Sequence, residues 1–144
     1  MSTSGLHTKR GFEVKNKIKD IMWKYCALVR NRHGLEKGLD MIKKIKHDDI
    51  PRLCTGGASL VFNRGCVEAM EAIHMTDLSE MVIRSALIRE ETRKSHYRTD
   101  FPKRNNQLWF KNIIIKKEGD NSVFNATPPV ITRLSPEEYK EVEK

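Results

Sequence analysis

Hydrophobic residues recur every three or four positions in three segments of the first two thirds of the chain, with lysines between them in the first two segments. This spacing is typical of amphipathic helices. It predicts one helix over residues 13–30, a second from Leu35 to about Asp48, and a third from Val61 or Cys66 to about Arg93. Three such stripes with short connections predict an antiparallel three-helix bundle of the spectrin-repeat type.

The apolar stripe of each predicted helix identifies the residues that we expect in the core. In the first helix they are Val14, Ile18, Ile21, Met22, Tyr25, Leu28 and Val29, and in the second Leu35, Leu39, Ile42 and Ile45. In the third they are Val67, Met70, Ile73 or His74, Leu78, Met81, Val82, Ser85 and Ile88.

The pattern changes after Pro102. Residues 108–117 are rich in aromatic and β-branched side chains, residues 118–121 form a turn signal, and residues 122–133 form a second such run. This predicts a β-hairpin whose second strand, interrupted by two prolines, lies at an edge. Ser135 to Glu138 begins a last short helix or frayed tail.

The predicted fold class is therefore mainly α, with a three-helix bundle followed by a C-terminal β-hairpin. We expect four parts, described by their residue ranges. They are a disordered lead-in at 1–12, the bundle at 13–101, the hairpin appendage at 102–134 and a C-terminal tail at 135–144.

Composition adds a strongly basic balance. The 144 residues, enough for one domain or one piece of a larger chain, carry a net charge of +8 from 27 basic and 19 acidic residues. Because the two signs are interleaved, we interpret most of this charge as solvated helix surface or a docking surface. Three cysteines without a C-x-x-C pair favour a reducing compartment. With neither a signal peptide nor a transmembrane run in the sequence, we expect a soluble, cytoplasmic protein without membrane insertion.

One stretch, from Met81 to Pro102, is the most informative part of the chain. Its apolar helical register gives way to a charged run that begins at Arg89, and it closes on Phe101 and Pro102. The residue before a proline avoids helical geometry, so the helix ends before Phe101. A helix that ends in a charged, aromatic, proline-stopped segment is suited to present that segment to a partner.

No complete catalytic motif accompanies this segment. Glu71 and His74 have the Glu-x-x-His spacing of di-iron bundles, but a site needs a second such motif, so we favour a packed or half-exposed histidine and assign no metal ligand. Basic and aromatic residues from Lys94 to Lys111 loosely fit a nucleic-acid surface. Interleaved acidic residues would repel phosphate, so we favour a salt-bridged helix end packed on the hairpin, with a helical Glu90–Lys94 pair.

Several short stretches, taken together and in order, resemble the C-terminal helical domain of succinate dehydrogenase and fumarate reductase flavoprotein subunits. They are Met22–Tyr25, Val29–Asn31, Gly34–Leu39, Ile83–Leu87, Arg89–Arg93 and His96–Pro102, followed by Trp109. The resemblance covers the chain from about Lys15 to about Arg133. The related adenylylsulfate reductase flavoprotein is an alternative, and L-aspartate oxidase is a more distant relative.

The resemblance implies an assembly role in an FAD-dependent oxidoreductase. The domain would pack on the FAD-binding domain and dock the iron–sulfur subunit, without being catalytic alone, and FAD would belong to the parent enzyme rather than to this chain. The interface residues that it implies are Arg89, Arg93, His96, Tyr97, Arg98, Asp100 and Trp109. The parent complex would reach the membrane through other subunits, and the isolated domain would dimerise through its uncovered face.

Two departures from the family pattern accompany this resemblance. Lys94 stands where the family usually has a glycine, and the flavin-binding and substrate-capping domains are absent from the sequence. The chain is thus expected to be a detached domain, natural or cloned. The alternative from another class is a stand-alone basic helical protein that binds nucleic acid or an acidic partner.

Overall fold

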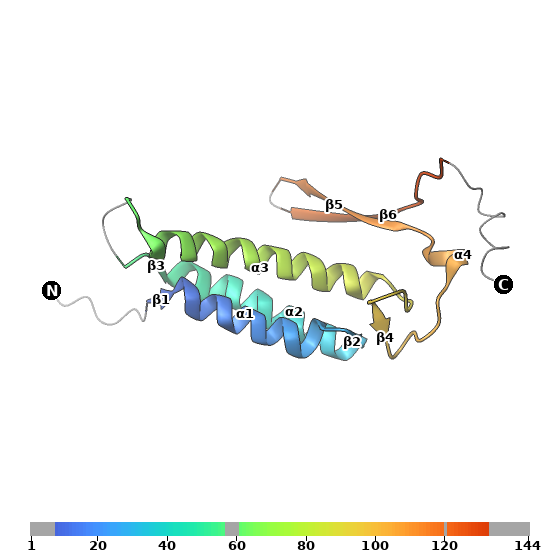
Figure 1. Ribbon diagram of the computed structural model, residues 1–144, viewed down its shortest axis with the longest axis horizontal. Helices are drawn as coiled ribbons and strands as arrows, with labels where there is room; N and C mark the ends of the chain where they lie inside the picture. Colours follow the sequence, from blue (N-terminus) through green and yellow to red (C-terminus); the bar gives the residue numbers. More distant parts are fainter. Residues whose placement is uncertain (1–7, 57–60, 120, 133–144) are drawn as a thin grey trace. The chain divides into compact units, whose positions relative to one another are not determined.

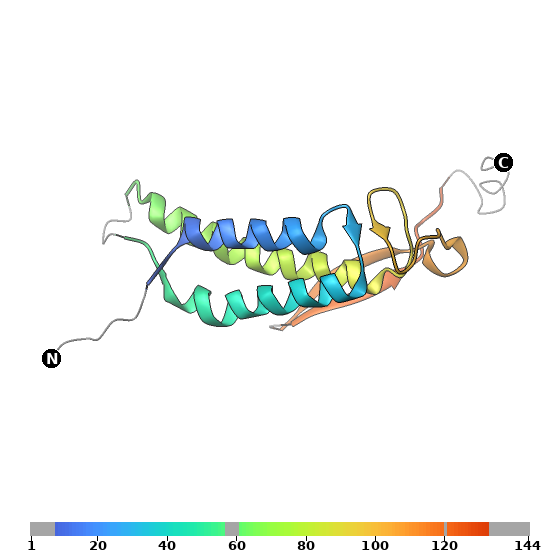
Figure 2. The ribbon, with the colours of Figure 1, turned by 90° about the horizontal axis from the view of Figure 1, so that it is seen from below.

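The computed structural model describes residues 8–56, 61–119 and 121–132, and the chain divides between Arg104 and Asn105 into two compact units. Three helices make up most of the first unit (Figure 1). They are α1 (Gly11–Cys26), α2 (Arg32–Lys44) and α3 (Arg64–Ile88). Every pair of these helices is in contact, and α2 runs opposite to α1 and α3 (Figures 1 and 2). The predicted antiparallel three-helix bundle is confirmed.

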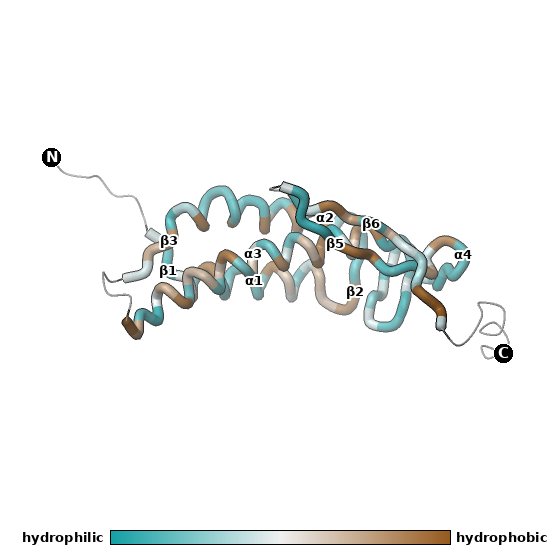
Figure 3. Tube along the Cα trace, turned by 90° about the horizontal axis from the view of Figure 1, so that it is seen from above, coloured by the Kyte–Doolittle hydropathy of each residue, from teal (hydrophilic) through white to brown (hydrophobic). Residues whose placement is uncertain are grey.

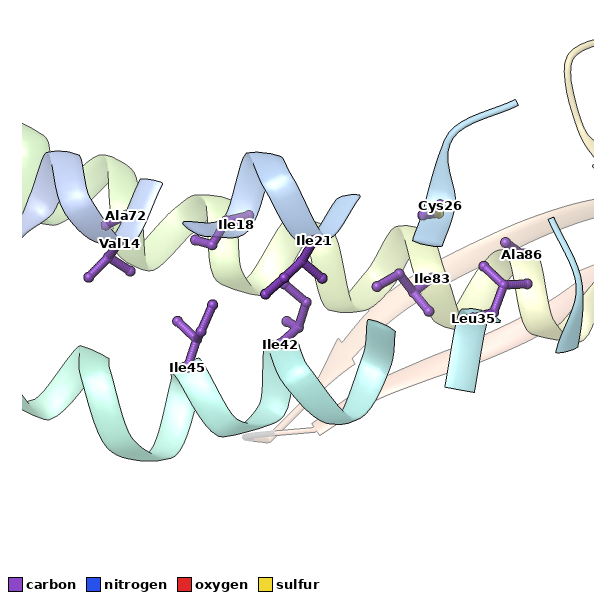
Figure 4. Close-up of a cluster of buried hydrophobic side chains, with 10 residues drawn as sticks. All are labelled: Val14, Ile18, Ile21, Cys26, Leu35, Ile42, Ile45, Ala72, Ile83 and Ala86. Carbon is purple, nitrogen blue, oxygen red and sulfur yellow. The ribbon is translucent and has the colours of Figure 1, made fainter. Parts of the chain in front are cut away.

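Apolar side chains from all three helices meet in the core of this bundle (Figure 4). The core consists of Val14, Ile18, Ile21, Cys26, Leu35, Ile42, Ile45, Ala72, Ile83 and Ala86. The predicted stripe of α2 is confirmed, because three of its four residues are buried and Leu39 packs against them. The stripe of α1 is correct only as far as Tyr25, because the helix ends at Cys26 and leaves Leu28 and Val29 exposed.

The prediction for the buried face of α3 is wrong. The residues that α3 buries are mostly small, namely Ala69, Ala72, Thr76, Ser79, Ile83 and Ala86. Several large apolar residues of the predicted stripe, such as Met70 and Leu78, are exposed instead. The physical reason is that α3 is apolar on two sides, and the small side chains allow the other helices to approach closely. The helix also ends at Ile88, five positions before the expected Arg93.

The helical course after α2 is longer than predicted. A π-helical turn, η1 (Ile45–Asp49), continues α2, and a 3-10 turn, η2 (Ile50–Arg52), follows it. The helical course therefore continues past the predicted end at about Asp48, as far as Arg52. Pro51 lies in the first turn of η2, where its missing N–H is tolerated, so it does not end the helical course earlier.

Each end of the bundle carries one parallel pair of very short strands (Figure 1). At one end β1 (Lys9–Arg10) pairs with β3 (Leu53–Cys54). At the other end β2 (Val29–Arg30) pairs with β4 (Tyr97–Arg98), with Val29 opposite Tyr97 and Arg30 opposite Arg98. The second pair ties the segment after α3 to the connection between α1 and α2.

The second unit contains a short helix, α4 (Asn106–Trp109), and two antiparallel strands, β5 (Asn112–Glu118) and β6 (Asn121–Thr127). The predicted hairpin is confirmed, and Gly119 in its turn has a φ of +60°. The first strand begins later than predicted, because Leu108 and Trp109 belong to α4. The helix or tail predicted from Ser135 lies outside the described residues.

Candidate docking segment

The segment from Arg89 to Pro102 begins where α3 ends, at a point where the last carbonyl groups of the helix need donors. The guanidinium of Arg98 supplies them. Its Nη1 donates to the carbonyl oxygens of Ala86 at 2.7 Å, Arg89 at 3.2 Å and Leu87 at 3.4 Å. Arg98 is completely buried. A cation at the negative end of the helix dipole is favourable, so this arginine acts as the cap of α3.

Asp100 neutralises the buried guanidinium. Its Oδ1 accepts from Nε of Arg98 at 2.8 Å, and its Oδ2 accepts from Nη2 at 2.7 Å. The same Oδ2 accepts from the backbone N–H of Arg32, the first residue of α2, at 2.9 Å. The hydrogen bonds from Arg98 hold the pKa of Asp100 far below its usual range. One ion pair therefore joins the C-terminal end of α3 to the N-terminal end of α2.

The segment also contains one fully buried carboxylate. Glu91 is 0 % exposed and lies between two arginines. Its Oε1 accepts from Arg89 Nη1 and from Arg93 Nε, each at 2.7 Å, and its Oε2 accepts from Arg93 Nη2 at 3.1 Å. A buried charge is tolerated only when it is paired and hydrogen-bonded, and Glu91 meets both conditions.

His96 connects the segment to the turn between α1 and α2. Its Nε2 lies 3.1 Å from the carbonyl oxygen of Arg89, and its Nδ1 lies 2.9 Å from Nη1 of Arg30. A carbonyl only accepts, so Nε2 carries the proton, and Nδ1 accepts from Arg30. The ring is therefore neutral. Partial burial, and then the nearby arginines, lower the pKa of His96.

The backbone of the segment is held by a tight turn and by one threonine. Arg93 and His96 exchange backbone hydrogen bonds of 2.9 and 3.0 Å around Lys94, whose φ is +52°. The Thr92 hydroxyl donates to carbonyl oxygens of the segment, at 2.9 Å to Phe101, and accepts from the backbone N–H of Arg98 at 2.9 Å. Bonds inside the segment thus add to its contacts with α2, α3 and β2 in fixing its shape.

The structure brings together six of the seven residues that the resemblance implied for the interface. Asp100 and the Arg89 carbonyl contact the buried Arg98, His96 contacts the same carbonyl, Arg89 and Arg93 share Glu91, and Tyr97 is 43 % exposed. Trp109 belongs to α4, in the other unit. The Glu90–Lys94 helical pair does not form, because the helix has ended, and Glu90 pairs with Arg32 instead.

Sequence reasoning missed three groups at this site. Arg30 of β2 contacts His96, Arg32 at the start of α2 pairs with Glu90, and Thr92 organises the backbone. A further surface adjoins Arg30. A groove along the end of α1 is lined by Met22, Trp23, Cys26, Ala27 and Leu28 with Lys19, Asp20 and Arg30, and Trp23 is 81 % exposed. Only three-dimensional contacts, which sequence does not reveal, identify these groups.

Groups suited to catalysis are engaged in structural contacts. Burial raises the pKa of Cys26, which disfavours the reactive thiolate. The carboxylate of Glu71 forms an ion pair with Lys15 across to α1. Over residues 8–56, 61–119 and 121–132, no three His, Cys, Asp or Glu side chains are grouped so that they could hold a metal ion, and no helix is long and apolar enough to cross a membrane.

Residues 15–141 match the sequence model of a family described as fumarate reductase flavoprotein C-term. One subunit of the fumarate reductase (CoM/CoB) of Methanothermobacter marburgensis is 37 % identical over 113 residues, covering 76 % of this chain and 19 % of the relative. The succinate dehydrogenase flavoprotein subunit of Rickettsia conorii is 30 % identical over 128 residues, covering 87 % of this chain and 21 % of the relative. The chain therefore spans about a fifth of the length of these relatives.

Two solved structures share the fold. E. coli quinol fumarate reductase FrdA superimposes with a TM-score of 0.81 at 21 % identity, over 89 % of this chain and 22 % of that one. An adenosine-5-phosphosulfate reductase in complex with sulfite superimposes with a TM-score of 0.78 at 24 % identity, over 90 % of this chain and 21 % of that one. At these identities the superpositions establish the fold alone.

Proposed function

This chain belongs to the fumarate reductase flavoprotein C-terminal family, and from that premise we propose that it is the C-terminal helical domain of a fumarate reductase or succinate dehydrogenase flavoprotein. In this role it packs against the FAD-binding domain of the same flavoprotein and docks the iron–sulfur subunit that exchanges electrons with the flavin. The domain holds its partners in place and performs no chemistry alone. FAD is the cofactor of the parent enzyme.

The observation that carries the docking role is the internal order of the segment from Arg89 to Pro102. Two fully buried charged residues, Glu91 and Arg98, are each matched by opposite charges. Burying ions stabilises a fold little compared with apolar residues of the same volume, whereas it can specify one conformation. A surface segment held in one shape at such cost is suited to repeated recognition of one partner.

The surface that this segment presents is basic and aromatic. Tyr97 is exposed, and Lys94 is exposed at the tip of the turn. Beside the segment, the half-exposed Arg32 side chain of α2 pairs with Glu90. Aromatic and arginine side chains are enriched where proteins bind one another. The positive charge favours an acidic partner surface and speeds association with it. In this proposal Arg98 and Asp100 position the contact residues, and Tyr97 and Lys94 touch the partner.

The test is co-purification with the affinity-tagged chain from its source cells, followed by mass spectrometry, iron analysis and flavin analysis. We expect a flavoprotein and an iron–sulfur subunit. The double variant Tyr97→Ala/Lys94→Glu should reduce the bound iron at least fivefold and leave the flavin in place. Lys43→Glu, an exposed lysine on α2, is the charge-matched control and should retain both. Equal iron in the double variant and the control would contradict docking through this segment.

Two alternatives remain testable with the same protein. The sequence resemblance to the adenylylsulfate reductase flavoprotein leaves a second flavoprotein branch open, and the identity of the co-purified subunits would reveal it. The net charge of +8 favours a stand-alone basic protein. For that alternative, a blot of source cells should show a band at 16.7 kDa, and nucleic-acid binding should persist at physiological salt. A band of much larger size would identify a flavoprotein domain.

A further inference from the structure

Helix α3 has two apolar faces, and only one of them lies in the bundle. The buried face consists of small residues and Ile83, and it packs against α1 and α2. The hydropathy colouring of Figure 3 shows hydrophobic residues recurring along α3. A surface helix of a soluble domain normally has one apolar face, directed to the core, and polar residues on the opposite face. The opposite face of α3 therefore requires an explanation.

We define the outer face of α3 as the stripe opposite to the buried one. Residues three or four apart share one side of a helix, and this spacing connects the members of the stripe. Among its large apolar residues, Val67 is 55 % exposed, Met70 54 %, Leu78 60 % and Val82 46 %. The full stripe is Val67, Met70, His74, Leu78, Met81, Val82, Ser85 and Ile88.

This stripe is continuous and carries few charges. It extends over most of the 25 residues of α3, and Glu71, which could interrupt it, is turned to Lys15 on α1. Stable interfaces resemble a domain core cut in half, with charged residues depleted at the centre. Contiguous apolar surface of this kind marks an interaction site. The outer face of α3 therefore has the character of a permanent interface rather than of a transient one.

The geometry points to one occupant for this face, namely the flavin-binding part of the flavoprotein polypeptide, an inference that rests on the proposed function. The relatives extend well beyond the region that this chain matches, since the chain covers 19 % and 21 % of two of them. A permanently apolar face fits a partner that is always present, as another part of one polypeptide is. The charged segment from Arg89 to Pro102 fits a separate subunit. The outer face of α3 thus serves packing within the flavoprotein, and the segment from Arg89 to Pro102 serves docking of the iron–sulfur subunit.

The test uses a fusion in which this chain replaces the matching region of its relative in the Methanothermobacter marburgensis fumarate reductase. Met70→Glu and Leu78→Glu introduce charge on the outer face. Met41→Glu on α2 is the matched control, because Met41 is also an exposed methionine on a bundle helix, at 37 % exposure. FAD per polypeptide and the fraction of soluble monomer are measured for each fusion, and the thermal midpoint for each variant of the isolated chain.

We expect the parent fusion and Met41→Glu to retain FAD, and Met70→Glu and Leu78→Glu to lose at least four fifths of it, while all isolated variants unfold at similar temperatures. Equal FAD in all fusions would overturn the inference and leave the proposed function intact. Lower midpoints of the isolated Met70→Glu and Leu78→Glu chains would also overturn it, by showing that this face is already covered. The inference would also be overturned if the isolated chain is a dimer, if these two substitutions convert it to a monomer, and if they leave FAD in the fusion unchanged. A parent fusion without FAD would count against the proposed function itself.

Discussion

At one end of the bundle β1 pairs with β3, and at the other end β2 pairs with β4, each pair being parallel and two residues long. The end at β1 and β3 relies on close backbone approach. A Cβ on Gly11 would overlap the backbone of Glu68 and lie 2.6 Å from the Ala69 amide nitrogen, and one on Gly65 would overlap the carbonyl group of Thr55. Here the fold depends on the absence of side chains.

The end at β2 and β4 relies on the opposite chemistry. Arg98, one of the four β2–β4 residues, is completely buried, and its guanidinium is satisfied by Asp100 and by the last carbonyls of α3. Close packing of glycine closes an end at low cost, whereas buried ions need a partner for every hydrogen-bonding group. The buried ions at the β2–β4 end therefore indicate a role beyond stabilising the bundle. This agrees with the proposed role of that end in docking.

Of the substitutions that test this comparison, removal of the buried guanidinium should lower the free energy of unfolding most. Arg98→Ala leaves Asp100 and the α3 carbonyls without their donor, and breaking a buried pair costs about 3–5 kcal/mol. Such a loss is a large part of the stability of a small domain. Urea unfolding measures it, with the exposed Arg52→Ala as control, for which a change within about 0.5 kcal/mol is expected. Similar midpoints for both variants would show that the network contributes no more than a surface arginine.

A methyl group at the glycine end should have the next largest effect. Gly11→Ala forces backbone apart, because the atoms that a Cβ would meet belong to the main chain of α3 rather than to a flexible side chain. Overpacking of this kind costs about 1–3 kcal/mol. Thermal unfolding of Gly11→Ala, and of Gly65→Ala as a second probe of the same end, measures the loss. Unchanged midpoints for both variants would refute the close approach.

The charged end should respond to mild acid. The pKa of His96 is lowered in the folded protein, so below pH about 6.5 the unfolded chain binds the proton more readily. The stability contribution is therefore complete above that pH and is lost as the pH falls. The slope stays below about 1.4 kcal/mol per pH unit, the limit for one proton, and partial exposure of the ring reduces it further.

Unfolding of parent and His96→Gln between pH 7.5 and 5.5 tests this expectation. The substitution should flatten the profile, and His33→Gln, at an exposed position on α2, is the matched histidine control. The carboxylates with lowered pKa values, Asp100, Asp48 and Glu71, titrate below this window. A pH profile that stays the same in His96→Gln would assign the response to another group.

The bundle and the hairpin could be predicted from the sequence, but the face of α3 could not. In α1 and α2 a single apolar stripe meets lysines on the other side, so periodicity identifies the core. In α3 the stripe with the larger residues points away from the bundle, and small residues such as Ala72 and Thr76 face inward. Hydropathy predicts that the larger residues face the core. Which face of α3 is buried is decided by the close approach of α1 and α2, which the sequence pattern does not show.

The candidate site was predicted by resemblance and not by chemistry. Arginine is rarely buried, so nothing local indicates that Arg98 lies beneath the surface. Its burial depends on the end of α3 and on Asp100 meeting in three dimensions. Trp109 was expected in a strand because of its β propensity, but Asn105 caps a helical turn there by accepting from the Leu108 amide at 3.0 Å. Local hydrogen bonding overrides a weak propensity.

The smallest predicted change in stability concerns the turn at Lys94. The β1–β3 end has glycines at its close contacts, whereas this turn at the charged end has a lysine. Lys94 has a φ of +52°, a region that costs other L-residues about 1–2 kcal/mol and that glycine adopts freely. The resembled family usually has glycine here. Lys94→Gly relieves this strain, but a more flexible unfolded chain offsets about 0.4–1 kcal/mol of the gain. The net result should be a rise in stability of less than about 1 kcal/mol.

Lys94→Ala separates the backbone effect from the charge effect, because alanine removes the same charge and keeps the strain. If strain decides, Lys94→Gly unfolds at a higher urea concentration than Lys94→Ala, which stays near the parent. If both variants gain equally, repulsion between Lys94 and the neighbouring arginines decides instead, and the turn conformation carries no measurable cost. A lysine retained at a strained position, with a stability gain available from glycine, then agrees with a role for its exposed charge in docking.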